Sequence, residues 1–503
     1  MTRRIYFIFL FAIAMFSFAG FKNISSYKMY TSSFENVLGT SLDMKFSALN
    51  EESADMAEKT AIKEIKRLNN LLSSYDENSA FSKWAKTSHQ SIEIPGELKE
   101  VLQQFEKWSS LTNGILTPAI APLDQVWKEA VIHQELPSAA TISEAIKNAN
   151  QQHWILDKND NNATHLTTTP LLLNSFVKSY IINKAIDEVM KIDGLNGALI
   201  NIGGDIVVKG DIKEEISILN PNQKSDNIFE SSKIQISNKA IATSGNYKRG
   251  YDINGTHYSH IINPLTGMPS DQIQSATVIA KDAVTAGALA TAFNVMTVDE
   301  SKLLANKFSG VEYQIVKSNN NIIESEGWEK LTTTKNSSTN KVNYRSKTKE
   351  KLWNSSYEAV VNIELARLEG FARRPFVAIW IVNSNNETVK NIALWFNKPR
   401  WLPDLKEWYH QNYQNYSTLP QGVFSISSAT RPAGNYTFKW DGKDDKGELV
   451  KQGKYTVYIE AAREHGTYQI MKQEFNALDK EQSFNIEGNT EIATAAVLYK
   501  KIQ

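Results

Sequence analysis

The sequence predicts an α+β protein in which a mixed α/β domain precedes a small β-sandwich domain. Three observations support this division. Helical and strand-like patterns alternate up to about residue 331, a polar stretch follows at 332–351, and short apolar strand-like runs dominate residues 352–503. At roughly 100–200 residues per domain, a chain of 503 residues has room for both cores.

The first predicted domain covers residues 30–331. Apolar residues at helical spacing predict helices at 54–72, 97–111 and 171–190, and a helix rich in small residues is expected at 285–296. In the second of these helices Leu98, Val101, Leu102, Phe105 and Trp108 share one face. Strands are expected at 197–202, 206–208 and 275–280.

The second predicted domain, residues 352–503, is rich in strand patterns. Strands are expected at 377–382, 392–396, 436–440 and 453–459, with a turn-rich loop between the last two. This density fits an immunoglobulin-like β-sandwich. Asp441, Asp444 and Asp445 in the loop raise the alternative of a calcium site. Their spacing lacks the closing Glu of an EF-hand, which favours an ordinary polar hairpin loop.

Composition excludes several function classes. Lys plus Arg and Asp plus Glu both number 55, so the chain lacks the basic excess of a general nucleic-acid binder. It also has no cysteine. This excludes disulfides, thiolate metal sites, a cysteine nucleophile and a lipidated N-terminal cysteine.

The N-terminus predicts export. Arg3 and Arg4 precede an apolar run at 5–18, and small residues follow around Ala19. This pattern is typical of a cleaved signal peptide, here residues 1–19. The alternative is an uncleaved membrane anchor, but the run is shorter than the ~20 residues that span a bilayer. We therefore expect a periplasmic protein that meets the membrane only through this segment.

Glycine- and hydroxyl-rich motifs follow the predicted strands. Asn-x-Gly-Gly-Asp occupies 201–205, Ala-Thr-Ser-Gly-x-Tyr occupies 242–247, and His-Ile-Ile-x-Pro-x-Thr-Gly-x-Pro occupies 260–269. Glycines let backbone N–H groups approach a phosphate, although a tight turn explains two glycines equally well. His257 and His260 also suggest zinc, but no third ligand is evident.

Two further motifs make the set more specific. Gly-x-x-x-Pro-x-x-x-Pro-Leu-x-x-x-Trp occupies 114–127, and Ala-x-Ala-Leu-Ala-Thr occupies 286–291. Taken in order, the motifs resemble the FAD:protein FMN transferase (ApbE) family over residues 44–331. The resemblance implies a flavin-transferase-like fold and an enzyme that binds FAD and Mg²⁺. Such an enzyme attaches FMN through a phosphoester to a Thr or Ser of an exported acceptor protein and releases AMP, while the metal offsets pyrophosphate charge.

The resemblance also assigns site residues. The flavin and pyrophosphate contacts fall on Lys178, Tyr180, Gly203, Gly204, Asp205, Ser244, Gly245, His260 and Thr266. His260 is the catalytic candidate. The metal ligands fall on the Val177 carbonyl and on Thr291.

Five motif positions differ from the family pattern. Gly287 stands where the family carries its metal-binding Asp. Carboxylates are also replaced at Asn263, Thr117 and Asn183, and Ser179 replaces a glycine. Losing a carboxylate ligand should weaken a magnesium site, and Asp282 is not on the helical face of Gly287. The main prediction is therefore a transferase, and the alternative is a non-catalytic periplasmic FAD-binding protein.

The second domain is similar to an uncharacterised periplasmic domain, and it contains a candidate acceptor. Flavin acceptor motifs resemble Asp-x-x-Ser-Gly-Ala-Thr, and residues 424–430 match at Ser427, Ala429 and Thr430 but not at Phe424 or Ser428. We hypothesise that Thr430 accepts FMN on the same chain. The alternative is an ordinary Ser/Thr-rich strand end. A structural or adhesion protein, with the sandwich as its working part, is a third interpretation of the whole chain.

Overall fold

The structure is a computed structural model. It describes residues 26–218, 221, 232–246, 249–332, 351–368, 372–396, 399–417, 427–428, 430–464 and 466–502. The predicted signal peptide (1–19) and nearly all of the predicted linker lie outside these residues. None of the described helices is long and apolar enough to cross a membrane.

The described elements alternate in the first part of the chain and are mostly strands in the second. In the first part they are β1 (Lys28–Val37), β2 (Thr40–Ala48), α2 (Glu51–Leu72), α3 (Ala80–Ala85), β3 (Ser91–Glu93), α4 (Gly96–Leu111), α5 (Ala121–His133), α6 (Ala139–Ala149), β4 (Trp154–Leu156), β5 (Asn162–His165), α7 (Val177–Val189), β6 (Leu195–Ile202), β7 (Asp205–Gly210), β8 (Glu214–Ile218), β9 (Ser232–Ile236), β10 (Lys239–Gly245), β11 (Gly250–Ile253), β12 (Thr256–Ser259), β13 (Ile273–Ala280), α8 (Ala283–Phe293), α9 (Val298–Ala305), β14 (Glu312–Lys317), β15 (Ile322–Glu324) and η1 (Glu329–Leu331). In the second part they are β16 (Tyr357–Leu365), β17 (Ala372–Arg373), β18 (Phe376–Asn383), β19 (Thr388–Trp395), η2 (Pro399–Asp404), α10 (Lys406–Ser417), β20 (Ser427–Ser428), β21 (Gly434–Trp440), β22 (Gly453–Ala462), β23 (Tyr468–Ala477), β24 (Gln482–Glu487) and β25 (Ile492–Lys501).

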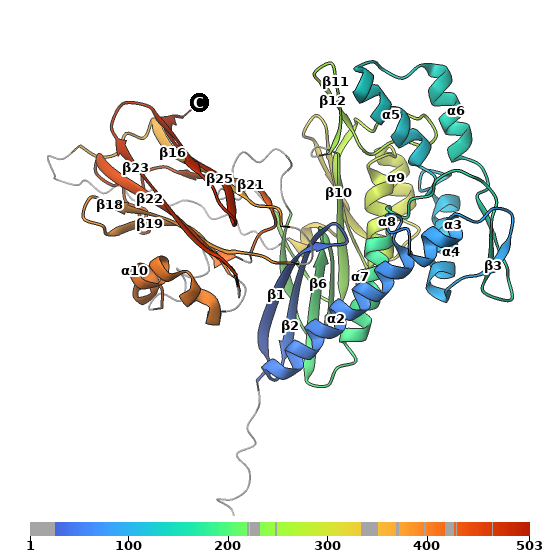
Figure 1. Ribbon diagram of the computed structural model, residues 1–503, viewed down its shortest axis with the longest axis horizontal. Coiled ribbons are helices and arrows are strands. Elements are labelled where there is room, and N and C mark those ends of the chain that lie inside the picture. Colours follow the sequence, from blue (N-terminus) through green and yellow to red (C-terminus); the bar gives the residue numbers. More distant parts are fainter. Residues whose placement is uncertain are drawn as a thin grey trace, which may run out of the picture.

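A nine-stranded sheet organises the first domain, with strand order β15-β14-β13-β10-β7-β6-β2-β1-β17. Helices α2, α7 and α8 pack on one face of it (Figure 1). Apolar side chains from these helices and the sheet form the main core. A smaller core on the sheet includes residues of the β8–β9 hairpin and Trp328. The mixed α+β architecture predicted from the sequence is confirmed.

Two of the expected helices agree closely with α2 and α4. The helix expected at 171–190 begins only at Val177. Leu171, Leu173 and Phe176 are buried, but they lie in a segment that is not helical. The apolar pattern of that buried segment therefore resembled helical periodicity. Helices α5 and α6 were not predicted.

Two sheets pack face to face in the second domain, in the orders β21-β16-β25-β24 and β20-β19-β18-β22-β23. Their facing side chains form one apolar core that includes Trp353, Trp440 and Tyr499. Helix α10 and η2 cover the outer face of the second sheet, where Trp380 and Trp408 are buried. The predicted β-sandwich is confirmed.

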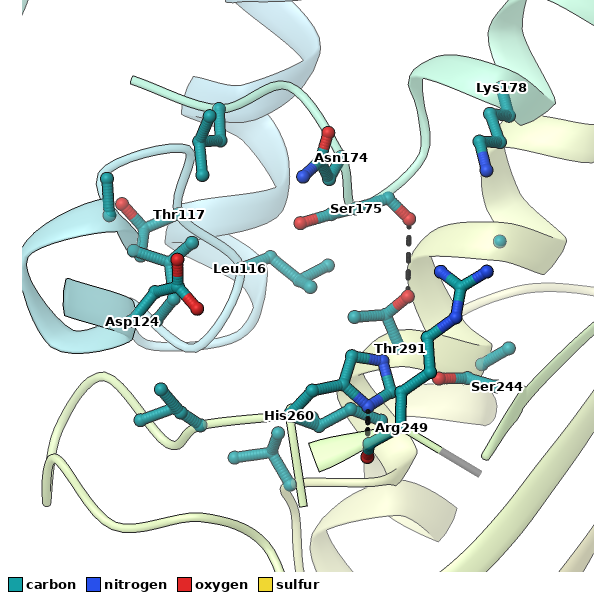
Figure 2. A pocket seen from close by; sticks show the side chains of 18 of the residues that line it. Leu116, Thr117, Asp124, Asn174, Ser175, Lys178, Ser244, Arg249, His260 and Thr291 are labelled. Atoms are coloured by element: carbon teal, nitrogen blue, oxygen red, sulfur yellow. Dashed lines mark hydrogen bonds between the residues drawn. The ribbon is translucent and has the colours of Figure 1, made fainter. Parts of the chain in front are cut away.

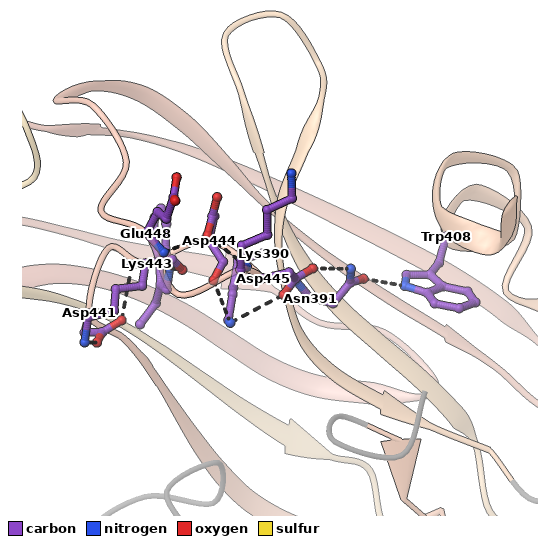
Figure 3. A network of polar contacts seen from close by, with 10 residues as sticks. Lys390, Asn391, Trp408, Asp441, Lys443, Asp444, Asp445 and Glu448 are labelled. Atoms are coloured by element: carbon purple, nitrogen blue, oxygen red, sulfur yellow. Dashed lines mark hydrogen bonds and ion pairs between the residues drawn. The ribbon is translucent and has the colours of Figure 1, made fainter. Parts of the chain in front are cut away.

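The acidic loop between β21 and β22 is a hydrogen-bonded turn (Figure 3). The Asp444 carboxylate accepts from the backbone N–H groups of Lys446 and Glu448, each at 2.9 Å. Asp445 accepts from the Asn391 amide at 2.9 Å, and Asn391 in turn accepts from the Trp408 indole at 2.9 Å. These carboxylates hold the loop and attach it to the second sheet, as expected of a polar hairpin loop.

The two domains share the large sheet. Strand β17, from the second part of the chain, pairs antiparallel with β1 by placing Arg373 opposite Phe34. The next residue, Arg374, is 2% exposed and forms an ion pair with Asp43 of β2 at 2.6 Å. The sandwich is thus docked on the edge of the first domain through backbone pairing and a buried charge.

Candidate functional site

A cavity of about 1010 Å³ opens in the first domain where β6, β7 and β10 meet the N-termini of α5 and α7 and one side of α8 (Figure 2). Its lining comes from segments far apart in the sequence, from Thr40 to Val295. Both polar and apolar groups line it. This combination is typical of a cavity that binds a small molecule.

A glycine turn between β6 and β7 forms one wall. Gly203 and Gly204 both have positive φ, at 63° and 103°. The Gly204 N–H donates to the Asn201 side chain at 3.0 Å, and Gly203 lies so close to Thr40 that a Cβ there would be 2.8 Å from its hydroxyl. Only glycine fits both the backbone conformation and the space at position 203.

Lys178, Ser179 and Asp205 meet beside this turn. The Ser179 hydroxyl donates to the Asp205 carboxylate at 2.7 Å. Burial raises the pKa of Asp205, while the Ser179 hydrogen bond and the Lys178 charge oppose that shift. Burial also lowers the pKa of the Lys178 ammonium, and the charge on Arg249 adds to that effect.

His260 lies on the other side of the cavity in a fixed orientation. Its Nδ1 and its backbone N–H both contact the Arg249 carbonyl oxygen, at 3.0 and 3.2 Å. Because a carbonyl can only accept, Nδ1 carries the proton and Nε2 keeps its lone pair. Burial lowers the pKa of His260, which favours this neutral form.

The His260–Pro269 segment is anchored from outside the cavity. The Trp127 indole donates to the Gly267 carbonyl at 2.9 Å, and Gly267 has a φ of 70°. A Cβ at Gly267 would collide with Ile142 of α6. The Trp of the 114–127 motif and the glycine of the 260–269 motif therefore act together to hold the histidine.

Helix α8 presents Gly287 and Thr291 to the cavity. A Cβ at Gly287 would collide with the Ser179 hydroxyl, so Ser179 fills the space beside this glycine. The Thr291 hydroxyl donates to the Ser175 carbonyl at 3.2 Å. Among the described residues, no group of three His, Asp or Glu side chains is arranged to hold a metal ion.

Comparison with known proteins agrees with this architecture. Residues 38–315, more than half of the chain, match the model of the "ApbE family". The chain belongs to the ApbE family. Residues 358–494 match a second family model, described as "Predicted periplasmic protein (DUF2271)".

The relatives carry a consistent name. The FAD:protein FMN transferase of Haemophilus influenzae is 27% identical over 289 residues, which cover 54% of this chain and 82% of that protein. The one of Vibrio cholerae is 27% identical over 305 residues, covering 57% and 87%. The solved structure of the ApbE protein of Thermotoga maritima aligns with a TM-score of 0.54 at 25% identity, covering 61% of this chain and all of that one. The flavin transferase ApbE from Vibrio cholerae aligns with a TM-score of 0.51 at 21% identity, covering 61% and 99%.

The cavity brings together most of the residues that the family motifs pointed to. From five separate segments, its lining includes Lys178, Gly203, Asp205, Ser244, Gly245, His260 and Thr291. Gly204 lies in the same turn as Gly203 but is not among the lining residues. Ser244 is held through its carbonyl, which accepts from the Asn294 side chain at 2.8 Å.

Three other predicted site residues lie elsewhere. Tyr180 is buried, points to Glu100 at 2.7 Å, and has a pKa raised by burial and by that carboxylate. Thr266 is exposed, and its hydroxyl accepts from the Met268 N–H within its own turn. Val177 is the first residue of α7 and packs against the main core. The carbonyl that Thr291 contacts is that of Ser175, two residues before Val177.

The cavity also contains polar residues that the motifs did not single out. Arg249 is the most important, because its side chain reaches into the cavity toward Lys178 (Figure 2). Asn174 and Ser175 line the approach to α7, and Asp124 and Lys128 form an ion pair at 2.6 Å on α5. Arg249 follows the Ala-Thr-Ser-Gly-x-Tyr motif by two residues. This proximity was the one feature of the sequence that could have indicated its place in the cavity.

Proposed function

We propose that this chain is an FAD:protein FMN transferase, which moves FMN from FAD to a Thr or Ser hydroxyl of an acceptor protein. The observation that carries the proposal is the convergence of seven motif residues on one cavity in a member of the ApbE family. The cavity is large enough for a dinucleotide, and its cations suit a diphosphate.

In the proposed reaction the acceptor oxygen attacks the phosphorus of the FMN half of FAD. A new phosphoester P–O bond forms, and the P–O bond to the AMP phosphate breaks. The proton of the acceptor hydroxyl leaves, and AMP departs as a phosphate anion. His260 is the residue of this chain best prepared to take the proton, because Nε2 is unprotonated while Nδ1 is fixed on a carbonyl.

The magnesium ion that the resemblance implies does not fit the residues present. The family's carboxylate ligand is replaced by Gly287, and the Ser179 hydroxyl occupies the adjoining space. The Thr291 hydroxyl is already bonded to the Ser175 carbonyl. Mg²⁺ binds through oxygen ligands that include one or two carboxylates, and Asp205 is the nearest acid but accepts from Ser179. We therefore assign no step to a metal.

We further propose that the chain acts in the periplasm on an exported acceptor. The match of residues 358–494 to a predicted periplasmic family supports this location, and the sequence pattern supports a signal peptide at 1–19. In this proposal residues 30–331 carry the transferase, residues 332–351 link the domains, and residues 352–503 form the periplasmic sandwich.

Thr430 is the candidate acceptor within the chain. The structure describes only Ser427, Ser428 and Thr430 of the acceptor-like stretch. Thr430 is 2% exposed, and its hydroxyl has no hydrogen-bond partner among the described residues. Modification requires this hydroxyl to leave its packed position, so a separate acceptor protein is the favoured substrate and Thr430 the second.

The direct test uses the chain from residue 20 onward, FAD, and an added protein that carries Asp-x-x-Ser-Gly-Ala-Thr. Intact mass and in-gel flavin fluorescence after denaturation report covalent FMN on either protein. We expect FMN on the added acceptor, and in His260→Asn a loss of transfer that is much larger than any loss of FAD affinity. If Thr430→Ala leaves FMN attached to the chain itself unchanged, the internal acceptor role fails.

The competing function is a non-catalytic periplasmic FAD-binding protein, which Gly287 specifically favours. It predicts that FAD binds and is wholly extractable, with neither protein labelled under any metal condition tested. That outcome would replace the transferase proposal.

A further inference from the structure

Two cations with no described partner face the same cavity. Lys178, the second residue of α7, and Arg249, just before β11, both line it. In the part of the chain that the structure describes, neither side chain takes part in an ion pair or hydrogen bond. Other basic side chains of the same domain, such as Lys45 and Lys128, are paired with carboxylates.

The two charges are close enough to act on each other. Figure 2 shows the Arg249 side chain rising from the His260 side of the cavity toward Lys178. The Arg249 charge disfavours the charged form of Lys178. Asp205 provides partial compensation, but its carboxylate accepts from Ser179 and is held in the wall of the cavity. Two like charges in one partly desolvated site favour an anionic ligand over a cation.

The packing around Gly287 also favours an anionic ligand over a cation. Ser179 and Gly287 fit each other, since any side chain at 287 would collide with the Ser179 hydroxyl. That hydroxyl donates a hydrogen bond to the Asp205 carboxylate. Among the described residues of this cavity, no group of three carboxylate or imidazole side chains is arranged to hold a divalent cation beside Lys178 and Arg249.

From these observations we propose that Arg249 and Lys178 together supply the positive charge that binds the FAD diphosphate in this chain, and that no divalent metal is required for that binding. The inference rests on the proposed function, because it takes FAD as the ligand. Arg249 is suited to the role, since a guanidinium remains charged and can donate two parallel hydrogen bonds to phosphate oxygens. Lys178 adds a point charge from α7.

The same pair can act during transfer. Negative charge shifts onto the departing AMP phosphate as its P–O bond to the FMN phosphorus breaks. Cations beside these oxygens stabilise that charge. The bonds that form and break are those of the proposed reaction, with no additional reactant.

The test compares FAD with riboflavin, which has the same ring but no phosphate. Dissociation constants are measured by flavin fluorescence titration on the full chain from residue 20, in EDTA and in excess Mg²⁺. For the unsubstituted chain we expect the same FAD affinity within about twofold in both buffers. For Arg249→Gln and Lys178→Gln we expect FAD affinity to fall roughly 10- to 100-fold, the range of a charge-assisted hydrogen bond.

Three comparisons control for indirect effects. Riboflavin affinity should change less than about twofold in these variants. Arg249→Lys should lose less FAD affinity than Arg249→Gln, because it keeps the charge but not the two parallel hydrogen bonds. Lys184→Gln removes one positive charge from the same helix but outside the cavity lining, where Lys184 pairs with Glu100 at 2.9 Å. It should bind FAD as the unsubstituted chain does.

The results that would contradict the metal-free proposal differ from the result that would contradict the proposed function. If EDTA abolishes FAD binding by the unsubstituted chain and Mg²⁺ restores it, the metal-free proposal is overturned while the proposed function stands. The same holds if both Gln variants bind FAD normally, or if they lose riboflavin as strongly as FAD. If the unsubstituted chain binds no FAD in either buffer, the proposed function itself fails.

Discussion

Two pairs of basic residues in this molecule have opposite surroundings. Arg373 and Arg374, at the junction of the domains, are held by carboxylates: Arg374 by Asp43 at 2.6 Å, and Arg373 by Glu58 at 3.2 Å. Lys178 and Arg249, in the cavity, have no ion pair among the described residues. A buried charge is costly unless it is paired, and in the cavity Lys178 is half-buried whereas Arg249 is exposed. The first pair is therefore complete without a ligand, whereas the second pair gains its counter-charge from one.

The two arginines at the junction are also connected to the cavity, through Asp43. Asp43 accepts from the Asn201 amide at 3.4 Å, and the Asn201 side-chain oxygen accepts from the Gly204 N–H at 3.0 Å. The glycine turn beside Gly203 is thus two hydrogen bonds away from Asp43. The docked sandwich and the cavity are therefore both supported by residues of β2 and β6.

The largest expected effect concerns how much the ion pair of Arg374 with Asp43 stabilises the folded chain. Arg374→Met removes the partner of Asp43 and the donor to the Thr430 carbonyl, which Arg374 contacts at 2.6 Å. We expect the free energy of unfolding to fall by about 3 kcal/mol, the lower end for breaking a buried pair. Urea unfolding followed by tryptophan fluorescence measures it.

Two variants sharpen this result. Adding Asp43→Asn to Arg374→Met should recover part of the loss, because no charge is then left unpaired and Ser33 keeps an acceptor. Lys351→Met breaks an exposed pair with Asp479 and should therefore cost far less than Arg374→Met. An Arg374→Met loss no greater than the Lys351→Met loss would contradict the role assigned to the buried pair.

The second prediction concerns the packing that replaces a carboxylate in the cavity. Gly287→Ala should destabilise by about 1–3 kcal/mol, because the new methyl group collides with the Ser179 hydroxyl. In a Ser179→Ala background the same change should cost less, because the hydroxyl is gone and only the Cβ of residue 179, at 3.1 Å, remains close. Thermal unfolding of the four combinations gives the coupling energy, expected to exceed about 1 kcal/mol.

A matched glycine provides the control. Gly96 begins α4, does not have a positive φ, and has open space within 4 Å of the position that a Cβ would take. Gly96→Ala should therefore be neutral or slightly stabilising. If Gly287→Ala behaves like Gly96→Ala, Ser179 does not occupy the space beside Gly287 in solution.

How far the sequence anticipated these features differs between the two regions. Ordered motifs pointed to Lys178, Gly203, Asp205, Ser244, His260 and Thr291, all of which line the cavity, because glycines and hydroxyls at fixed spacing are recognisable patterns. Arg249 lies in the same cavity but was not predicted. A single arginine in a polar stretch has no periodicity, and only the tertiary fold shows that it has no counter-ion among the described residues.

The junction was not predicted for a related reason. Strand β17 has two residues, too few for an alternating pattern, and it pairs with a strand more than 300 residues earlier in the chain. Helices α2 and α4 were predicted because each has a long amphipathic face. The start of α7 was misplaced, because apolar residues in the preceding non-helical segment are buried just as helical ones are.

The smallest predicted effect separates the two arginines of the junction. Arg373 is 29% exposed by side chain, whereas the Arg374 side chain is 2% exposed. Arg373→Gln should cost less than Arg374→Met, because water reaches part of the Arg373 side chain, although its partners Glu58 and Glu464 are largely buried. In 1 M NaCl, where the screening length is about 3 Å, this cost should fall by a larger fraction than the cost of Arg374→Met. Urea unfolding at low and high salt measures both. Equal salt dependence of the two variants would show that exposure does not distinguish them, and that Arg374 is more accessible to solvent than its packing indicates.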